Sequence, residues 1–195
     1  DYGTNRLRKV TKDAVVSTVV ATPNIYPYSV WGGSVCVGPD GNIYHASSTL
    51  MQIRKITPEG AITTIAGDLE NTNAVDGTNF SARFNIPNDI TADVFGNLYV
   101  TDAGGPTIRK MTPIGNDWVV TTIAGSPGLM GNANGTGSVA RFTNPAGITT
   151  DSDGKVLISD YNIGPNGARI RIAVPSGANR WTNANNGKWE EATTK

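Results

Sequence analysis

The side chains best suited to catalysis or metal binding are scarce in this sequence. It holds one histidine, His45, and one cysteine, Cys36, among 195 residues. One imidazole cannot build a zinc site from several histidines, and one thiol cannot form an intrachain disulfide or a thiolate cluster. Serines are plentiful, but no nucleophile-elbow motif accompanies them. The sequence therefore predicts no catalytic residue, no metal ligand and no required cofactor.

Asn88 and Asp89 are the predicted ligand-binding residues. They open a segment rich in Ile and Thr, and Asp89 stands where the next repeat of the chain has Gly147. A carboxylate at such a position could bind a cation such as calcium, or a polar ligand. It could equally cap a local turn by accepting backbone N–H groups. Both interpretations stay open.

Other polar residues are better explained by structure than by chemistry. Asp102 and Asp160 recur once per repeat, which indicates a hydrogen bond to each residue's own turn. Arg83 and Arg141 also recur, and each is expected to pack on its loop and pair with a neighbouring aspartate. His45 and Cys36 are expected to be buried core residues.

Charge and composition exclude several classes of function. The 16 basic residues balance the 16 acidic ones and are scattered along the chain, unlike the basic patch of a nucleic-acid-binding protein. No apolar run reaches the ~20 residues of a membrane-spanning helix, and no signal peptide is recognisable. We therefore expect neither nucleic acid nor a membrane span. The first residue is not methionine, so the chain is expected to be a processed, excised or incomplete piece of a longer protein.

One phrase occurs twice at a fixed spacing. Thr-Thr-Ile-Ala-Gly at residues 63–67 returns at 121–125, and the following Ala-Arg-Phe at 82–84 returns at 140–142. Both copies are thus 58 residues apart, and a proline follows three residues after each phenylalanine, at Pro87 and Pro145. Repeats of this kind mark solenoids, propellers or arrays.

Short runs of Val, Ile and Thr between Gly- and Asp-rich turns predict many short strands and no long helix. The connections are too short for parallel crossovers, so consecutive strands should form antiparallel meanders of four. Phe84 and Phe142 are expected to wedge between adjacent sheets. The loop at 68–86 is expected to contain no strand. The expected strands are residues 6–11, 14–21, 34–37, 42–46, 52–57, 61–66, 89–92, 97–101, 107–112, 118–124, 147–150, 156–159 and 169–174.

Several of these segments together resemble NHL repeats, of the long-loop type found in many bacterial secreted or surface proteins. The resemblance rests on Ile-Arg-Lys-Ile-Thr-Pro-Glu-Gly at 53–60, Ile-Arg-Lys-Met-Thr-Pro at 108–113 and Asn-Leu-Tyr-Val-Thr-Asp at 97–102. It implies an all-β fold, a β-propeller of four-stranded antiparallel blades whose innermost strands line a central channel. It also implies an extracellular or cell-surface location.

The repeats supply three to four blades, fewer than a complete NHL propeller has. The expected units within residues 1–174 are a half blade at 1–21, blades at 32–67 and 87–125, and an incomplete blade at 145–174. Residues 175–195 are expected to be a polar tail or the last outer strand. The ring would be completed either by residues outside this chain or by self-association with other copies.

The resemblance leaves three functions open. The preferred hypothesis is a non-enzymatic scaffold that binds a protein or a glycan through its loops and channel rim. The alternatives are part of a metal-dependent hydrolase or lyase, and a structural subunit of an extracellular assembly. Two matches to the glycosylation acceptor pattern, at Asn79 and Asn134, are near chance in a chain so rich in Asn, Ser and Thr.

Overall fold

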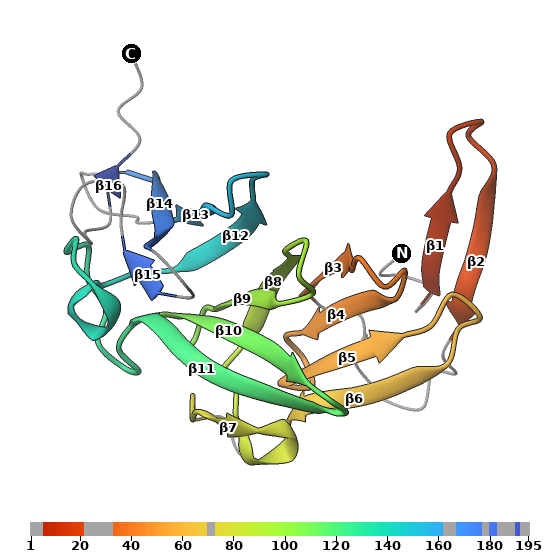
Figure 1. The fold of residues 1–195 in the computed structure, drawn as a ribbon, viewed down its shortest axis with the longest axis horizontal. Helices are drawn as coiled ribbons and strands as arrows, with labels where there is room; N and C mark the ends of the chain where they lie inside the picture. The colour runs from red at the N-terminus through yellow and green to blue at the C-terminus, as the bar shows by residue number, and fades with distance from the viewer. Residues whose placement is uncertain are drawn as a thin grey trace.

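The chain folds into a series of antiparallel β-sheets set side by side along an arc (Figure 1). The computed structural model describes residues 6–21, 33–69, 73–161, 167–176, 180–182 and 190–191, and from residue 174 onward only the backbone. The described part contains strands and two 3-10 turns, η2 (Asn79–Ser81) and η3 (Gly137–Val139). The expected all-β class is confirmed, and the fold is a partial β-propeller.

Four sheets follow one another in chain order. The first pairs β1 (Arg6–Val10) with β2 (Val16–Ala21). The second is β3 (Gly33–Val37), β4 (Ile43–Ser47), β5 (Gln52–Ile56) and β6 (Ile62–Gly67). The third is β8 (Pro87–Ala92), β9 (Leu98–Asp102), β10 (Thr107–Ile114) and β11 (Asp117–Gly125), with β7 (Gly77–Thr78) at its outer edge. The fourth is β12 (Pro145–Thr150), β13 (Val156–Asp160) and β14 (Arg169–Ser176), to which β15 (Arg180–Thr182) and β16 (Glu190–Glu191) pair.

The inner strands β3, β8 and β12 are neighbours across the sheets, so their ends converge on a common axis. Each leads into the second strand of its sheet through a tight turn containing a glycine, and Gly41, Gly96 and Gly154 all have φ near +80° (78°, 83° and 79°). Glycine adopts this conformation without the steric cost that a Cβ would bring. The three turns therefore lie at equivalent places, at the opposite end of the inner strands from Asn88 and Asp89.

Two apolar clusters fill the spaces between the sheets. Phe84, fully buried, lies in a cluster that joins the second and third sheets, and Phe142, also fully buried, lies in one that joins the third and fourth. Both wedges expected from the sequence are confirmed. Burying a phenylalanine contributes about 1.5–3 kcal/mol.

A β-bulge precedes the same arginine in three sheets. The pairing register shifts between Leu7 and Arg8, between Ile53 and Arg54, and between Ile108 and Arg109. A bulge of this kind re-aims the side chain that follows it. In the third sheet it accompanies an Arg109 side chain that is wholly buried.

The loop at 68–86 differs from its prediction as strand-free. β7 pairs with Val119 and Val120 of β11, and Val75 forms an isolated bridge with Arg83. A Cβ on Gly77 would lie 2.9 Å from the Ser81 carbonyl carbon, so this tight loop requires glycine there. Two residues of strand are too few to produce a sequence pattern, which explains the error.

The last described segments lie beside β14. β15 pairs with residues 174–176, and β16 pairs with Arg171 and Ile172. Of the expected polar tail or outer strand, residues 177–179, 183–189 and 192–195 lie outside the described part. No helix in the described part has the length and hydropathy to cross a membrane.

Candidate functional site

Asn88 and Asp89 lie where the inner strands of three sheets meet. They line a shallow hollow of about 360 Å³ at the starting ends of these strands. Its other lining residues are small and come from the strands on either side: Gly33, Ser34, Ala146 and Gly147.

Both residues bond across to the next sheet. Asp89 Oδ2 accepts the Ile148 N–H at 2.7 Å, and Asp89 Oδ1 accepts the Ile90 N–H at 2.9 Å. Asn88 Nδ2 donates to the Ala146 carbonyl at 3.2 Å. Asp89 therefore caps backbone N–H groups, one of which belongs to the neighbouring strand β12. Its ligand role stays a prediction.

The glycine opposite Asp89 fits this contact. A Cβ on Gly147 would lie 3.0 Å from Ser159 Oγ and 3.7 Å from Asp89 Oδ2. The Gly147 N–H donates to Ser159 Oγ at 2.8 Å, just as the Asp89 N–H donates to Thr101 Oγ1 at 3.0 Å. Where β8 has Asp89, β12 has Gly147. The Asp89 side chain therefore bonds the β12 backbone, and the glycine leaves space beside this contact.

The thiol of Cys36 and the imidazole of His45 have surroundings that suit a structural role. Cys36 packs against the core between the second and third sheets, and burial, with Asp89 and Asp40 nearby, raises the pKa of its thiol to about 12. A thiol with so high a pKa is a poor nucleophile at neutral pH. His45 is 1% exposed on β4, between Val35 and Arg54 in register, as expected for a core position.

A buried arginine closes each of the two joints that link the second, third and fourth sheets, which we call the Arg109 seam and the Arg171 seam. Arg109 is fully buried on β10, and its guanidinium lies 5.0 Å from the Phe84 ring centroid. It contacts Asp102 Oδ2 at 3.3 Å and Asp76 Oδ1 at 2.9 Å. It also donates to the backbone carbonyls of Arg83 at 2.9 Å and Val75 at 2.8 Å.

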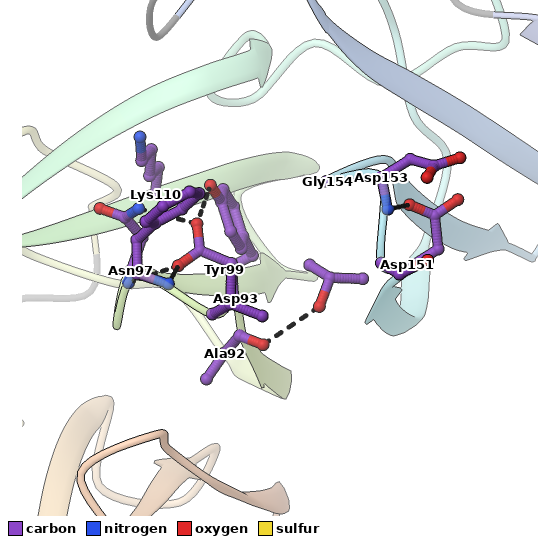
Figure 2. Close-up of a pocket in the computed structure, with 12 residues that line it drawn as sticks. Ala92, Asp93, Asn97, Tyr99, Lys110, Asp151, Asp153 and Gly154 are labelled. Carbon is purple, nitrogen blue, oxygen red and sulfur yellow. Dashed lines mark hydrogen bonds between the residues drawn. The ribbon is translucent and has the colours of Figure 1, made fainter.

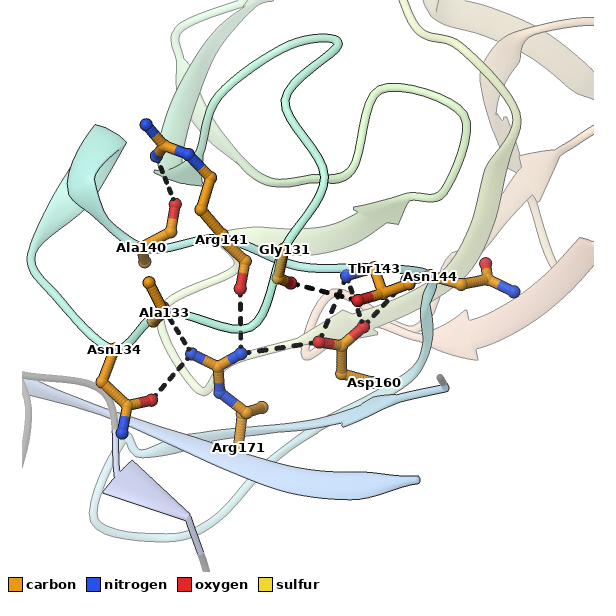
Figure 3. Close-up of polar contacts among 9 residues, drawn as sticks. All are labelled: Gly131, Ala133, Asn134, Ala140, Arg141, Thr143, Asn144, Asp160 and Arg171. Atoms are coloured by element: carbon orange, nitrogen blue, oxygen red, sulfur yellow. Dashed lines mark hydrogen bonds and ion pairs between the residues drawn. The ribbon is translucent and has the colours of Figure 1, made fainter. Parts of the chain in front are cut away.

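Figure 3 shows the matching polar contacts around Arg171 of β14. The Arg171 guanidinium lies 4.9 Å from the Phe142 ring centroid. Arg171 contacts Asp160 Oδ2 at 3.5 Å and donates to Asn134 Oδ1 at 2.9 Å. It donates to the Arg141 and Ala133 carbonyls at 2.9 and 3.1 Å. The contacts match those of Arg109 one by one, with Asn134 in place of Asp76.

The prediction that Asp102 and Asp160 bond their own turns is wrong. Asp102 accepts the Asn85 N–H at 2.7 Å, and Asp160 accepts the Asn144 N–H at 2.9 Å, so each bonds the loop that enters its sheet instead of its own turn. The contact partners lie 17 and 16 residues away in sequence, which local turn reasoning could not find. Burial raises the pKa of Asp102 to about 7, while Arg109 and the Asn85 N–H act in the opposite direction.

The recurring surface arginines hold their own loops. Arg83 pairs with Asp68, with Nη2 and Oδ2 3.6 Å apart, which confirms the expected aspartate partner. Arg141 bonds the Ser138 and Ala140 carbonyls. Sequence reasoning missed the buried arginines because the Ile-Arg-Lys pattern alternates like that of any half-exposed strand.

A larger hollow, lined by both polar and apolar side chains, lies at the other end of the inner strands (Figure 2). It measures about 620 Å³ and is bounded by two hairpin turns, one between β8 and β9 and one between β12 and β13. Thr150 Oγ1 donates to the Ala92 carbonyl at 3.1 Å and ties the two turns together. We call it the hairpin hollow. It is lined by Ala92, Asp93, Val94, Phe95, Asn97, Tyr99, Lys110, Thr150, Asp151, Ser152, Asp153 and Gly154.

Asp93 organises one wall of the hairpin hollow. Its Oδ1 accepts the Phe95 and Asn97 N–H groups, both at 2.9 Å, and its Oδ2 accepts the Tyr99 hydroxyl at 3.0 Å. Burial, together with the Asp93 carboxylate that accepts this hydroxyl proton, raises the pKa of Tyr99 well above its usual value. Lys110 Nζ lies 5.9 Å from the Tyr99 ring centroid. This wall is fixed before any ligand arrives.

The side chains that face solvent around the hairpin hollow differ from turn to turn. Phe95 is 83% exposed, the largest exposure of any large apolar residue in the described part. Asp153 occupies the same position of the other turn, with its side chain 70% exposed. The second sheet has Asp40 there, which folds back to accept the Tyr44 hydroxyl at 2.8 Å. Position three of the turn is therefore aromatic in one repeat and acidic in two.

The described residues contain no group of three or more His, Cys, Asp or Glu side chains arranged to hold a metal ion. The hairpin hollow instead combines an exposed aromatic ring with carboxylates, an amide and an ammonium group. Such a surface can stack a flat apolar face and exchange hydrogen bonds with hydroxyl groups.

No protein-family model matches the sequence, and no curated protein sequence does either. Solved structures do match. A Bacteroides thetaiotaomicron protein of unknown function is 26% identical, with a TM-score of 0.71 over 80% of this chain and 39% of the other. An auxiliary nutrient binding protein from the same organism is 20% identical, with a TM-score of 0.64 over 82% of this chain and 41% of the other.

Virginiamycin B lyase from Staphylococcus aureus is 16% identical, with a TM-score of 0.53 over 100% of this chain and 65% of the lyase. The chain spans about two fifths of the length of the two Bacteroides proteins. Together these likenesses place it among β-propellers.

Proposed function

We propose that the chain is part of a non-enzymatic, NHL-type β-propeller that binds a glycan at the hairpin hollow. The observation that carries this proposal is Phe95, an aromatic ring 83% exposed at the edge of a hollow of about 620 Å³. A large apolar side chain is held in water at the tip of a rigid turn, where it adds nothing to the core. Exposed aromatics beside a recess are typical of binding sites.

The chemistry of the lining favours a sugar ring. The C–H face of a pyranose can pack on Phe95, while its hydroxyl groups donate to the carboxylates of Asp151 and Asp153. Lys110 supplies a cation on the same wall, which suits a glycan that carries a carboxylate. The turns are held by the Asp93 contacts and the Thr150 bond, so binding costs little ordering entropy.

The proposal has three further parts, which concern a second contact region, cofactors and the location. Asn88 and Asp89 are proposed as a second contact region, for a ligand group that enters the channel mouth. No cofactor is proposed, although calcium is the cation that Asp89 would take. The location is proposed to be extracellular or at the cell surface, on the strength of the NHL resemblance. The nutrient-binding protein with the same fold is compatible with a binding role.

A glycan microarray followed by calorimetric titration tests the proposal, with and without calcium. We expect a defined oligosaccharide to bind and Phe95→Ser to weaken binding about tenfold or more. Phe80→Ser is the matched control, because Phe80 is 59% exposed on η2, away from the hairpin hollow.

The alternatives predict other results. Binding only to a protein, with the same loss on Phe95→Ser, would keep the scaffold function and reject the glycan. Turnover of the bound glycan in the presence of a divalent cation would reject the non-enzymatic role in favour of a metal-dependent hydrolase or lyase. Binding that survives Phe95→Ser would reject the hairpin hollow.

A further inference from the structure

The Arg109 and Arg171 seams differ at one chemically reactive position. Asp76 and Gly77 in the first seam correspond to Asn134 and Gly135 in the second, 58 residues later. Both acceptors meet the arginine at the same distance, 2.9 Å from Nη2 to Oδ1. One seam therefore holds an amide where its counterpart holds a carboxylate.

We propose that Asn134 is a site of spontaneous deamidation, and that the reaction converts the Arg171 seam into the charged form that the Arg109 seam already has. The Asn-Gly pair is the sequence context in which a backbone nitrogen reaches the preceding side-chain carbonyl with least hindrance. Asparagine is among the thermolabile residues for this reason.

The fold itself requires the glycine. A Cβ on Gly135 would lie 2.7 Å from Val139 Cγ1 and 3.2 Å from the Ala140 nitrogen. Gly77 is required in the same way at its loop, where a Cβ would lie 3.0 Å from the Ala82 nitrogen. The glycine cannot be exchanged without rebuilding the loop, so an asparagine before it is always in the reactive context.

The reaction balances with water as the only co-reactant. The Gly135 nitrogen bonds to Asn134 Cγ, the Cγ–Nδ2 bond breaks, and Nδ2 leaves as ammonia with the proton from the Gly135 N–H. The product is a succinimide. Water then opens this ring at the Cγ–N bond to give aspartate, or at the main-chain carbonyl to give isoaspartate.

Arg171 acts on both steps through one contact. Its Nη2 donates to Asn134 Oδ1 at 2.9 Å, and this oxygen carries the negative charge of the tetrahedral intermediate in each attack on Cγ (Figure 3). Asn134 is exposed, so ammonia can leave and water can enter. By favouring attack at Cγ, the guanidinium directs ring opening toward ordinary aspartate.

The structure also disfavours the other product. Isoaspartate adds a carbon to the main chain beside Gly135, which is buried and already too close to Val139 for a Cβ. Aspartate leaves the backbone unchanged and places a carboxylate on Arg171, as Asp76 does on Arg109. The expected product is therefore an ion pair between Arg171 and the new carboxylate at position 134.

Peptide mapping by mass spectrometry, combined with enzymatic detection of isoaspartate, tests this on the full chain after incubation at mildly alkaline pH. We expect conversion at Asn134 with aspartate as the main product in the folded protein. In denaturant, where Arg171 no longer contacts the site, we expect isoaspartate to dominate at the same residue. Asn166 and Asn186, which also precede glycine, serve as internal comparisons in both conditions.

Two variants sharpen the result. Asn134→Gln keeps an amide acceptor and is expected to lose the Asn134 charge variant on ion exchange. Asn134→Asp is expected to elute with the deamidated wild type. The proposal is overturned if Asn134 keeps its amide in the folded protein under conditions that convert it in denaturant. It is also overturned if the proportion of isoaspartate at Asn134 is the same in both.

Discussion

The seams and the hairpin turns are both repeated regions, but they repeat different things. The Arg109 and Arg171 seams repeat their contacts almost atom for atom, including the stacked phenylalanine and the two backbone carbonyls. The turns repeat their backbone and part of their polar contacts, but their third position changes from Asp40 to Phe95 to Asp153. What recurs once per blade holds blades together, and what varies between blades is available for recognition.

The turns show how a backbone can be kept while its side chains change. In the third sheet Asp93, at the first turn position, bonds Asn97 and Tyr99. In the second sheet that position is Gly38, and Asp40 bonds the corresponding Asn42 and Tyr44.

A Cβ on Gly38 would lie 2.6 Å from the Tyr44 ring and 2.8 Å from Asp40 Oδ1. Glycine therefore leaves the space into which the carboxylate folds. The Asp93 arrangement frees the third position for Phe95.

Removing a seam arginine is expected to have the largest effect of any change considered. Arg109→Met leaves Asp102 buried without its cation and should lower the free energy of unfolding by about 3–5 kcal/mol. Arg171→Met should act in the same direction through Asp160. Chemical denaturation measures both. Glycan affinity measured on the folded fraction should stay unchanged. A loss of affinity without a loss of stability would contradict the conclusion that the seams stabilise the fold and the turns bind the ligand.

Asn79 tests a contact that only one seam has. Its Nδ2 donates to Asp117 Oδ1 and its Oδ1 accepts the Trp118 N–H, both at 2.7 Å, while the equivalent position of the other seam is Gly137. Asn79→Ala should lower the free energy of unfolding by about 1–2 kcal/mol. Thermal denaturation measures it, with exposed Asn132→Ala as the control. An unchanged melting temperature would show that the Asn79 contacts carry no stability.

Exchanging the acceptor residues, Asp76 and Asn134, should move the ion pair from the Arg109 seam to the Arg171 seam. Asp76→Asn removes a half-exposed ion pair and should cost roughly 0.5–1 kcal/mol, and Asn134→Asp should gain a similar amount. High salt should reduce both effects. Denaturant titration of the two single variants and the double variant measures this. Changes of the same sign in both variants would contradict the equivalence of the seams.

The pH dependence of stability should reflect Asp102. Its pKa is about 7 in the folded chain and near 4 when unfolded, so the folded state holds the proton more tightly. The contribution of this group is therefore fully present below about pH 4 and is lost as pH rises through about 7. Asp102→Asn should flatten this part of the stability profile, and an unchanged slope would show that Asp102 does not titrate there.

The sequence was sufficient for the architecture because short patterns recur in it. The 58-residue offset, the Gly turns and the two wedge phenylalanines predict the sheets and their order. β7 could not be predicted, because it is two residues long and forms only when Gly77 allows the loop to close on itself. Arg109 and Arg171 each donate to loop carbonyls that lie 26 to 38 residues away, beyond any local pattern.

The candidate site was less accessible from sequence. Asn88 and Asp89 were found because Asp89 breaks the repeat, and the same comparison applied to the turns would have found Phe95. The sequence alone makes no prediction for Phe95. Its exposure follows from the turn geometry, since Gly96 and Asp93 fix a backbone that points the third side chain into solvent.

The most direct measurement is a pair of calorimetric titrations on Phe95→Ser and Phe80→Ser with the glycan that the wild-type chain binds, alongside their unfolding curves. We expect Phe95→Ser to lose about tenfold or more in affinity with its stability unchanged, and Phe80→Ser to keep wild-type affinity. Equal affinities in the two variants, or a loss of stability in Phe95→Ser that matches its loss of binding, would contradict it.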